Sequence, residues 1–149
     1  MCNLLGNIFR FLIFSIVLLL ASSVYGKSFG DYEGAIYLRN YDGDTITFNL
    51  PDLHPIIGEK IAIRVNGIDT PEIKGKCPKE KYDANQAKDM VADILKDAEQ
   101  ITLKNMERGK YFRIAADVIV DGDSLADILI EAGMAIKYHG GKKTHKWCN

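Results

Sequence analysis

The chain has 149 residues, of which 47% are hydrophobic and 26% charged, and its formal net charge is −1. This composition excludes a disordered protein and predicts one compact domain. The charge balance also excludes a broadly basic surface, so any affinity for a polyanion must come from local groups of basic residues. Lysine-rich stretches at 74–81 and 142–146 are such groups, although each is equally typical of a solvated loop.

Residues 1–26 predict a signal peptide rather than a part of that domain. A single basic residue, Arg10, precedes an apolar run that starts at Phe11, and small residues follow up to Gly26. A membrane anchor is the competing interpretation, but the 16 residues from Phe11 to Gly26 fall short of the roughly 17 to 25 that a spanning helix needs. We therefore expect a secreted or periplasmic protein whose domain occupies residues 27–149.

Strands dominate the predicted domain, because short apolar runs are bounded by turn residues. The hydrophobic period changes to that of a helix only twice. In chain order the predicted elements are strands 35–39, 45–50 and 60–68, a helix from about 78 to 98, strands 101–106 and 111–120, and a helix from about 124 to 133. Five strands with a helix after the third indicate an α+β, mainly β fold, namely a five-stranded OB-type Greek-key barrel with two or three helices.

Alternation along two strands predicts where two acidic residues lie. Asp44 shares the parity of the apolar positions in 45–50, and Asp69 shares that of the apolar positions in 60–65. The start of one strand in a hairpin lies beside the end of the next, so both carboxylates should meet at one mouth of the barrel. A buried pair of this kind requires a cation or hydrogen-bond donors nearby.

The position of Arg64 predicts a break in the third strand. Arg64 and Asp69 are five residues apart, which strict alternation would send to opposite faces. We expect the alternation to fail at Asn66-Gly67, as a bulge or as the end of the strand. In the last long strand, Tyr111 and Arg113 share the face opposite the apolar row.

Together these residue types suit the hydrolysis of a phosphodiester. Two aspartates and a backbone carbonyl make an oxygen-rich seat for Ca²⁺, a glutamate can act as general base, and two arginines can neutralise a phosphate. The candidates are Asp44, Asp69 and Thr70 for the metal, Glu72 for the base, and Arg64 and Arg113 for the phosphate. Each of them alone is also typical of a turn, a helix start or a surface, so the prediction depends on their conjunction.

Two cysteines follow the predicted leader, Cys77 and Cys148. In an exported chain a disulfide between them is the natural inference. Two free thiols are the alternative. A zinc site completed by His139 or His145 is disfavoured, because the ligands lack the usual spacing.

Four motifs carry a resemblance to a known family. They are Asp42-Gly43-Asp44-Thr45, Arg64 with Asp69-Thr70-Pro71-Glu72, Glu80-Lys81-Tyr82, and Lys110-Tyr111-Phe112-Arg113. In order, spacing and residue type they resemble the thermonuclease family, whose type member is staphylococcal nuclease, over roughly residues 34–138. The resemblance implies an OB barrel and calcium-dependent cleavage of DNA and RNA to products ending in 3′-phosphate, with the residue roles given above.

The resemblance also implies contacts with the substrate. Lys110 and Tyr111 match positions that contact a terminal phosphate, and Tyr138 falls near the segment in which the family stacks bases. Phe112 departs from the family, which commonly has glycine before the second arginine. DNA and RNA are the expected partners, with no stable protein partner and a monomeric state.

Two noncatalytic interpretations compete with a nuclease. An OB module that binds nucleic acid without cleaving it is the main one, because a fold does not dictate an activity. Such a module would be expected to lack some of the catalytic set, all of which is present here. A secreted calcium-binding structural domain explains Asp44 and Asp69 but gives no reason for Arg64, Glu72 and Arg113. The sequence therefore predicts a secreted, calcium-dependent, sugar-nonspecific nuclease.

Overall fold

The computed structural model describes residues 28–109 and 113–148. The predicted leader lies outside the described residues, and so do Lys110, Tyr111 and Phe112. In the described ranges, no helix combines the length and the apolar character that crossing a membrane requires.

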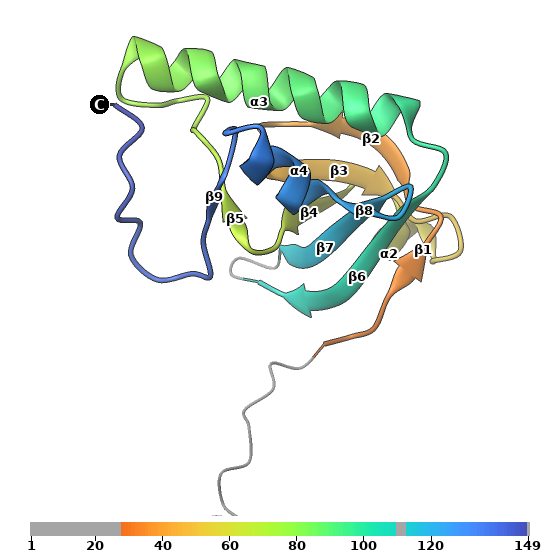
Figure 1. Cartoon of the computed structure of the whole chain (residues 1–149). Helices are drawn as coiled ribbons and strands as arrows, with labels where there is room; N and C mark the ends of the chain where they lie inside the picture. Colours follow the sequence, from red (N-terminus) through yellow and green to blue (C-terminus); the bar gives the residue numbers. More distant parts are fainter. Residues whose placement is uncertain (1–27, 110–112, 149) are drawn as a thin grey trace, which may run out of the picture.

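Strands make up most of the regular structure, and three helices accompany them in the described part (Figure 1). In chain order the elements are β1 (Tyr32–Glu33), β2 (Ile36–Asn40), β3 (Thr45–Asn49), α2 (Pro55–Gly58), β4 (Ile61–Val65), β5 (Ile68–Asp69), α3 (Pro78–Asp97), β6 (Ile101–Arg108), β7 (Ile114–Val120), β8 (Asp123–Ser124), α4 (Leu125–Glu131) and β9 (Ile136–Lys137). The five predicted strands correspond to β2, β3, β4, β6 and β7. The predicted α+β, mainly β fold is thereby confirmed.

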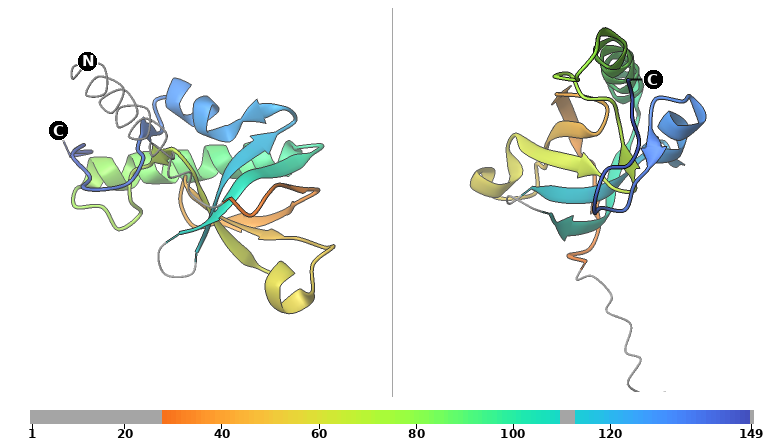
Figure 2. Two further views of the ribbon diagram at one scale, coloured as in Figure 1. Left: turned by 90° about the horizontal axis from the view of Figure 1, so that it is seen from below. Right: turned by 90° about the vertical axis from the view of Figure 1, so that its left-hand side faces the viewer.

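One curled sheet forms the barrel, with the strand order β1-β6-β7-β4-β3-β2. As predicted, β2, β3 and β4 pair in succession and antiparallel, while β4 pairs in parallel with β7. β1 and β2 stand at the two ends of this order, although only Gly34 and Ala35 separate them along the chain. The sheet therefore curls until its two edge strands, which are consecutive in the chain, lie near each other (Figure 2). This curling is typical of an OB-type barrel.

The core lies between the inner face of this sheet and the two longer helices. Alternate residues of β3, such as Ile46 and Phe48, are fully buried, as the strand period requires. α3 packs along β2 and buries Val91 and Leu95, while α4 lies against β7 and buries Leu129 (Figure 1). Burial of these rows holds the barrel rigid, so the side chains at its mouth are firmly positioned.

Several short elements were not predicted. α2 lies between the predicted strands 45–50 and 60–68, where the His54 side chain caps the helix and Pro55 occupies its first turn. β5 and β9 form a separate two-stranded sheet, and β8 pairs with β7. Runs of two residues carry no readable period, which is why the sequence does not reveal these strands.

Candidate active site

The turn between β2 and β3 carries the first acidic residues of the site. The Asp42 carboxylate accepts hydrogen bonds from the backbone N–H groups of Asp44 (3.1 Å) and Thr45 (2.8 Å). The Asn40 side chain donates to the carbonyl oxygens of Asp42 (2.8 Å) and of Lys88 in α3 (2.9 Å). The turn is therefore fastened to α3, and Asp44, which is 4% exposed, is held at the mouth of the barrel. This role of Asn40 was not predicted, although an asparagine two residues before Asp42 was a signal for it.

Gly43 lets this turn approach the second acidic segment closely. A Cβ atom at Gly43 would lie 2.8 Å from Thr70 Cγ2 and 3.0 Å from Ala87 Cβ in α3. Neither contact could form without displacing its neighbour, since such distances are shorter than van der Waals contact. Close packing, rather than an unusual backbone angle, therefore accounts for glycine between the two aspartates.

The predicted break in the third strand is confirmed. β4 ends at Val65, and Gly67 adopts a φ of +77°, which a residue with a side chain rarely adopts. After the turn the chain forms β5, which leaves the barrel sheet and pairs with β9. Arg64 and Asp69 consequently reach the same place in spite of their unfavourable spacing.

Asp44 and Asp69 meet at this mouth, as the strand parity predicted, and the break in the strand brings Arg64 between them. Arg64 Nη1 lies 2.5 Å from Asp44 Oδ1, and Arg64 Nη2 lies 3.8 Å from Asp69 Oδ1. Nη2 also donates to the Ile68 carbonyl oxygen (3.0 Å), and the Thr70 N–H donates to Asp44 Oδ2 (3.3 Å). Burial alone would lower the pKa of Arg64, but the two aspartates outweigh it and raise that pKa above its ordinary value. Arg64 therefore remains charged between two buried carboxylates.

Glu72 and Asp69 share a second cation, Lys143, from the segment after β9. Lys143 Nζ lies 2.7 Å from Asp69 Oδ1 and 2.7 Å from Glu72 Oε1. Burial alone would lower the pKa of Lys143, but the contacts with Asp69 and Glu72 outweigh it and raise that pKa above its ordinary value. Lys143 thus lies in an exposed loop, as one interpretation of the sequence had it, but its ammonium group is paired with the two carboxylates.

Asp69 Oδ1 shows that the cluster suits a metal ion. This oxygen is buried and accepts no hydrogen bond within the described part of the chain. The ammonium group of Lys143 lies 2.7 Å from it in an ion pair. An oxygen with a free lone pair, beside a second buried carboxylate, is the kind of hard donor set that fits Ca²⁺.

An open cleft of about 730 Å³ collects most of the predicted site residues. Its lining includes Asp44, Arg64, Glu72, Arg113, Tyr138 and Lys143. Asp69 instead lines an adjoining hollow of about 490 Å³, to which Glu72 and Lys143 also contribute. Arg113 is exposed just before β7, and its carbonyl oxygen accepts a hydrogen bond from the Gly109 N–H (2.8 Å). Lys110 and Tyr111 lie outside the described residues, so their roles remain predictions.

Tyr138 reaches the cleft through the same turn that positions Asp69. Its backbone N–H donates to the Gly67 carbonyl oxygen (2.8 Å), and its hydroxyl donates to the Gly141 carbonyl oxygen (2.7 Å). Tyr138 is thus held in the lining of the cleft.

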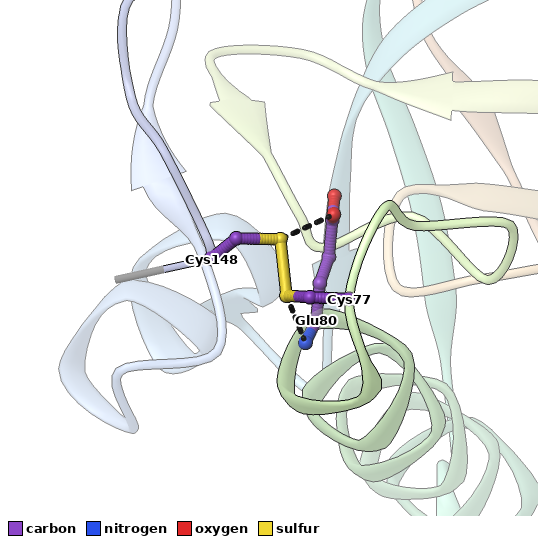
Figure 3. Close-up of side chains that lie close together, drawn as sticks. All are labelled: Cys77, Glu80 and Cys148. Carbon is purple, nitrogen blue, oxygen red and sulfur yellow. Dashed lines mark hydrogen bonds between the residues drawn. A yellow bond between two sulfur atoms is a disulfide. The ribbon is translucent and has the colours of Figure 1, made fainter.

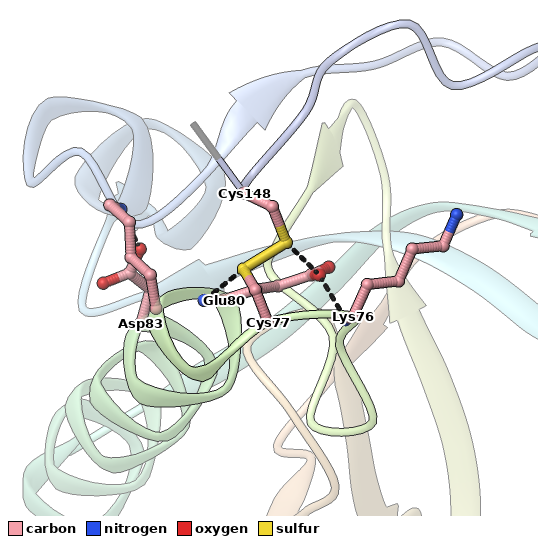
Figure 4. Close-up of a disulfide and its surroundings, with 6 residues drawn as sticks. Lys76, Cys77, Glu80, Asp83 and Cys148 are labelled. Atoms are coloured by element: carbon pink, nitrogen blue, oxygen red, sulfur yellow. Dashed lines mark hydrogen bonds and ion pairs between the residues drawn. A yellow bond between two sulfur atoms is a disulfide. The ribbon is translucent and has the colours of Figure 1, made fainter.

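The predicted disulfide is present between Cys77 and Cys148 (Figure 3). Cys77 caps α3, since its sulfur accepts a hydrogen bond from the Glu80 N–H (3.4 Å). Glu80 Oε2 accepts from the Lys76 N–H (2.8 Å) and lies 3.4 Å from the Cys148 sulfur (Figure 4). The disulfide excludes both the free thiols and a metal site at Cys77, Glu80 and Cys148, because the sulfurs are bonded to each other.

Asp42→Asn should stabilise the metal-free protein above pH 6. Burial and the charge of Asp44 raise the pKa of Asp42 from 3.8 to about 6, although backbone hydrogen bonds oppose the shift. The folded state therefore favours the protonated carboxyl, and the stability that this contributes is present below pH 3.8 and lost as the pH rises through about 6. Asparagine keeps the oxygen that accepts the two N–H bonds.

Urea unfolding in the presence of a chelator, repeated across pH, measures this effect. Above pH 6 the variant should exceed the wild type by up to about 3 kcal/mol in free energy of unfolding. The difference should shrink towards pH 4. A difference that stays constant from pH 4 to pH 8 would show that the charge of Asp42 is not its cause.

A comparison with family models agrees with this geometry. The model described as staphylococcal nuclease homologue matches residues 62–147, which is more than half of the chain. The matched range contains Arg64, Asp69, Glu72 and Arg113, and the turn that carries Asp44 is joined to it by the contacts described above. A search of curated proteins found no match.

Proposed function

We propose that this chain, which belongs to the family of staphylococcal nuclease homologues, is a calcium-dependent nuclease. Its substrates would be DNA and RNA, cleaved at phosphodiester bonds to leave 3′-phosphate ends. The observation that carries the proposal is the buried cluster of Asp44, Arg64 and Asp69 beside the exposed carboxylate of Glu72. A structural domain would have no need for an arginine and an exposed glutamate at one open cleft.

Asp44, Asp69 and the Thr70 carbonyl would hold Ca²⁺, whose charge would polarise a phosphate oxygen. Glu72 would take a proton from the attacking water, because its half-exposed carboxylate borders the cleft. Arg64 and Arg113 would bind the phosphate and offset the negative charge that develops in the transition state. The water oxygen would bond to phosphorus as the bond from phosphorus to the 5′ oxygen breaks. The 5′ oxygen would take up a proton and leave as a hydroxyl, and the phosphate would stay on the 3′ oxygen.

A noncatalytic nucleic-acid-binding module is the second candidate. The contact between Lys143 and Glu72 favours it, because the Glu72 oxygen that faces Lys143 is occupied by an ion pair and is not available to a water molecule. Binding of nucleic acid and cleavage must therefore be measured separately.

Digestion of single-stranded DNA and RNA by the protein without residues 1–26 tests the proposal. We expect cleavage with Ca²⁺, no cleavage after chelation, and products with 3′-phosphate ends. Restoration on adding Ca²⁺ back serves as the control for damage by the chelator. Binding of nucleic acid without cleavage at any calcium concentration would favour the noncatalytic module instead.

The place of action is a further part of the proposal. The apolar segment that starts at Phe11 supports export, and the Cys77–Cys148 disulfide supports an oxidising compartment. We therefore place the protein outside the cytoplasm, secreted or periplasmic, and acting as a monomer.

A further inference from the structure

The segment that follows β9 has little structure of its own. It leaves β9 beside the cleft and runs to the start of α3, where Cys148 is bonded to Cys77 (Figures 1 and 2). No helix or strand is formed after Lys137 in the described part of the chain, and residues 139–146 are exposed. We refer to residues 139–148 as the tail. Since the tail buries little surface, a few specific contacts must determine its path.

Contacts at Lys143 and at Cys148 hold the tail against the rest of the domain. Lys143 forms ion pairs with Asp69 and Glu72, and Cys148 forms the disulfide with Cys77. The aromatic contact between His145 and Trp147, with ring centroids 4.5 Å apart, lies within the tail itself. The segment that carries Lys143 is therefore bonded covalently to the domain a few residues further on, at Cys148.

We propose that Lys143 is a tethered cation that competes with Ca²⁺ for Asp69, and that the Cys77–Cys148 disulfide sets its effective concentration. This inference rests on the proposed function, because it concerns the metal that the nuclease would use. It assigns to Lys143 and to the disulfide the control of calcium affinity.

The position of Lys143 indicates that it would compete with Ca²⁺ for the same oxygen atom of Asp69. Lys143 Nζ lies 2.7 Å from Asp69 Oδ1, the buried oxygen without a hydrogen-bond donor. Calcium binds carboxylate oxygens at 2.3–2.6 Å, so an ion on the same oxygen would lie within about 5 Å of the ammonium group. Like charges at that distance repel each other strongly near a partly buried site. Lys143 in this position therefore opposes binding of the metal to Asp69.

The disulfide explains why a single lysine can compete. The Lys143 side chain is 45% exposed and that of Glu72 is 51% exposed, and ion pairs between exposed groups are weak by themselves. The pairing is intramolecular in any case, because the backbone at Tyr138 is hydrogen-bonded to Gly67, and the disulfide adds a second anchor on the other side of Lys143. Restricting the segment at both ends raises the effective concentration of the ammonium group at the carboxylates. Without the disulfide, the tail would be anchored only at Tyr138 and the pairing would weaken.

Calorimetric titration with Ca²⁺ alone, in the absence of nucleic acid, tests the role of Lys143. Lys143→Met should bind Ca²⁺ about three- to tenfold more tightly than the wild type. The matched control is Lys142→Met, which removes the same charge from an adjacent exposed position that forms no ion pair in the described structure. It should change the calcium affinity less than twofold.

The outcomes separate this inference from the proposed function. Measurable and equal calcium binding by the wild type and Lys143→Met overturns the inference alone. An equal gain in the Lys142→Met control also overturns it, because the effect would then be one of net charge. No calcium binding by any of the proteins overturns the inference together with the calcium dependence of the proposed function.

A second set of variants tests the tether. In Cys77→Ser with Cys148→Ser, serine at position 77 can still cap α3, so the helix should persist. This double variant should bind Ca²⁺ more tightly, and adding Lys143→Met should change little further, since both changes act on one interaction. If the double variant does not fold, a flexible Gly-Ser insertion after Thr144 weakens the tether with the disulfide intact and should give the same gain. Independent, fully additive gains would show that the disulfide does not act through Lys143.

Discussion

Glu72→Gln should slow the cleavage of single-stranded DNA by about 10²- to 10⁴-fold at saturating Ca²⁺, the range typical of a lost general base. The amide can still orient a water molecule but cannot accept its proton. Because the Glu72 side chain is 51% exposed and its ion pair with Lys143 is at the surface, the substitution should leave the fold intact. Initial rates at several substrate concentrations, with the urea midpoint of both proteins, measure the two effects.

Glu107→Gln is the matched control for this variant. Glu107 is an exposed acidic residue that lines the same cleft, so its replacement changes the local charge equally. Its cleavage rate should stay close to that of the wild type. If Glu107→Gln slowed the reaction as much as Glu72→Gln, the loss would reflect the changed charge of the cleft and its effect on the substrate. Glu72 would then not be the base.

The barrel could be predicted because its signals are local. Alternation in β3 and β4 and the helical period of α3 are each readable within a short window. The pairing of β5 with β9 could not be predicted in this way. It depends on β9 (Ile136–Lys137) returning to Asp69 from far along the chain, and two-residue strands leave no trace in the sequence.

The same contrast holds within the site. Strand parity was enough to bring Asp44 and Asp69 together, and Gly67 marked the break that admits Arg64. Lys143 was missed because its contact with Glu72 spans 71 residues and arises from the path of the tail. Gly43 was interpreted as a turn residue, whereas its packing against Thr70 is visible only when α3 is in place.

Arg64→Gln should abolish most of the nuclease activity and should make the stability of the fold more dependent on calcium. Loss of a guanidinium group that stabilises the transition state should lower the cleavage rate by about 10²- to 10³-fold. The substitution also leaves Asp44 and Asp69, which are 4% and 2% exposed, without their shared counter-ion. In chelator, we expect a loss of about 1 to 3 kcal/mol in free energy of unfolding, the usual penalty for an unpaired buried group.

Calcium should restore that stability, because an ion bound to the two carboxylates replaces the missing positive charge and stabilises the folded state by mass action. The rise in urea midpoint on adding Ca²⁺ should therefore be larger for Arg64→Gln than for the wild type. Arg39→Gln, at an exposed position on β2, is the control and should show the wild-type response.

Arg64→Lys separates the charge of this residue from its geometry. Lysine keeps a positive charge between the carboxylates, so most of the stability in chelator should remain. It cannot contact Asp44, the Ile68 carbonyl oxygen and a phosphate at once, as the forked guanidinium can, so the cleavage rate should stay low. Full activity in Arg64→Lys would mean that Arg64 acts only as a counter-ion for the aspartates, and the phosphate would then have to be held by Arg113.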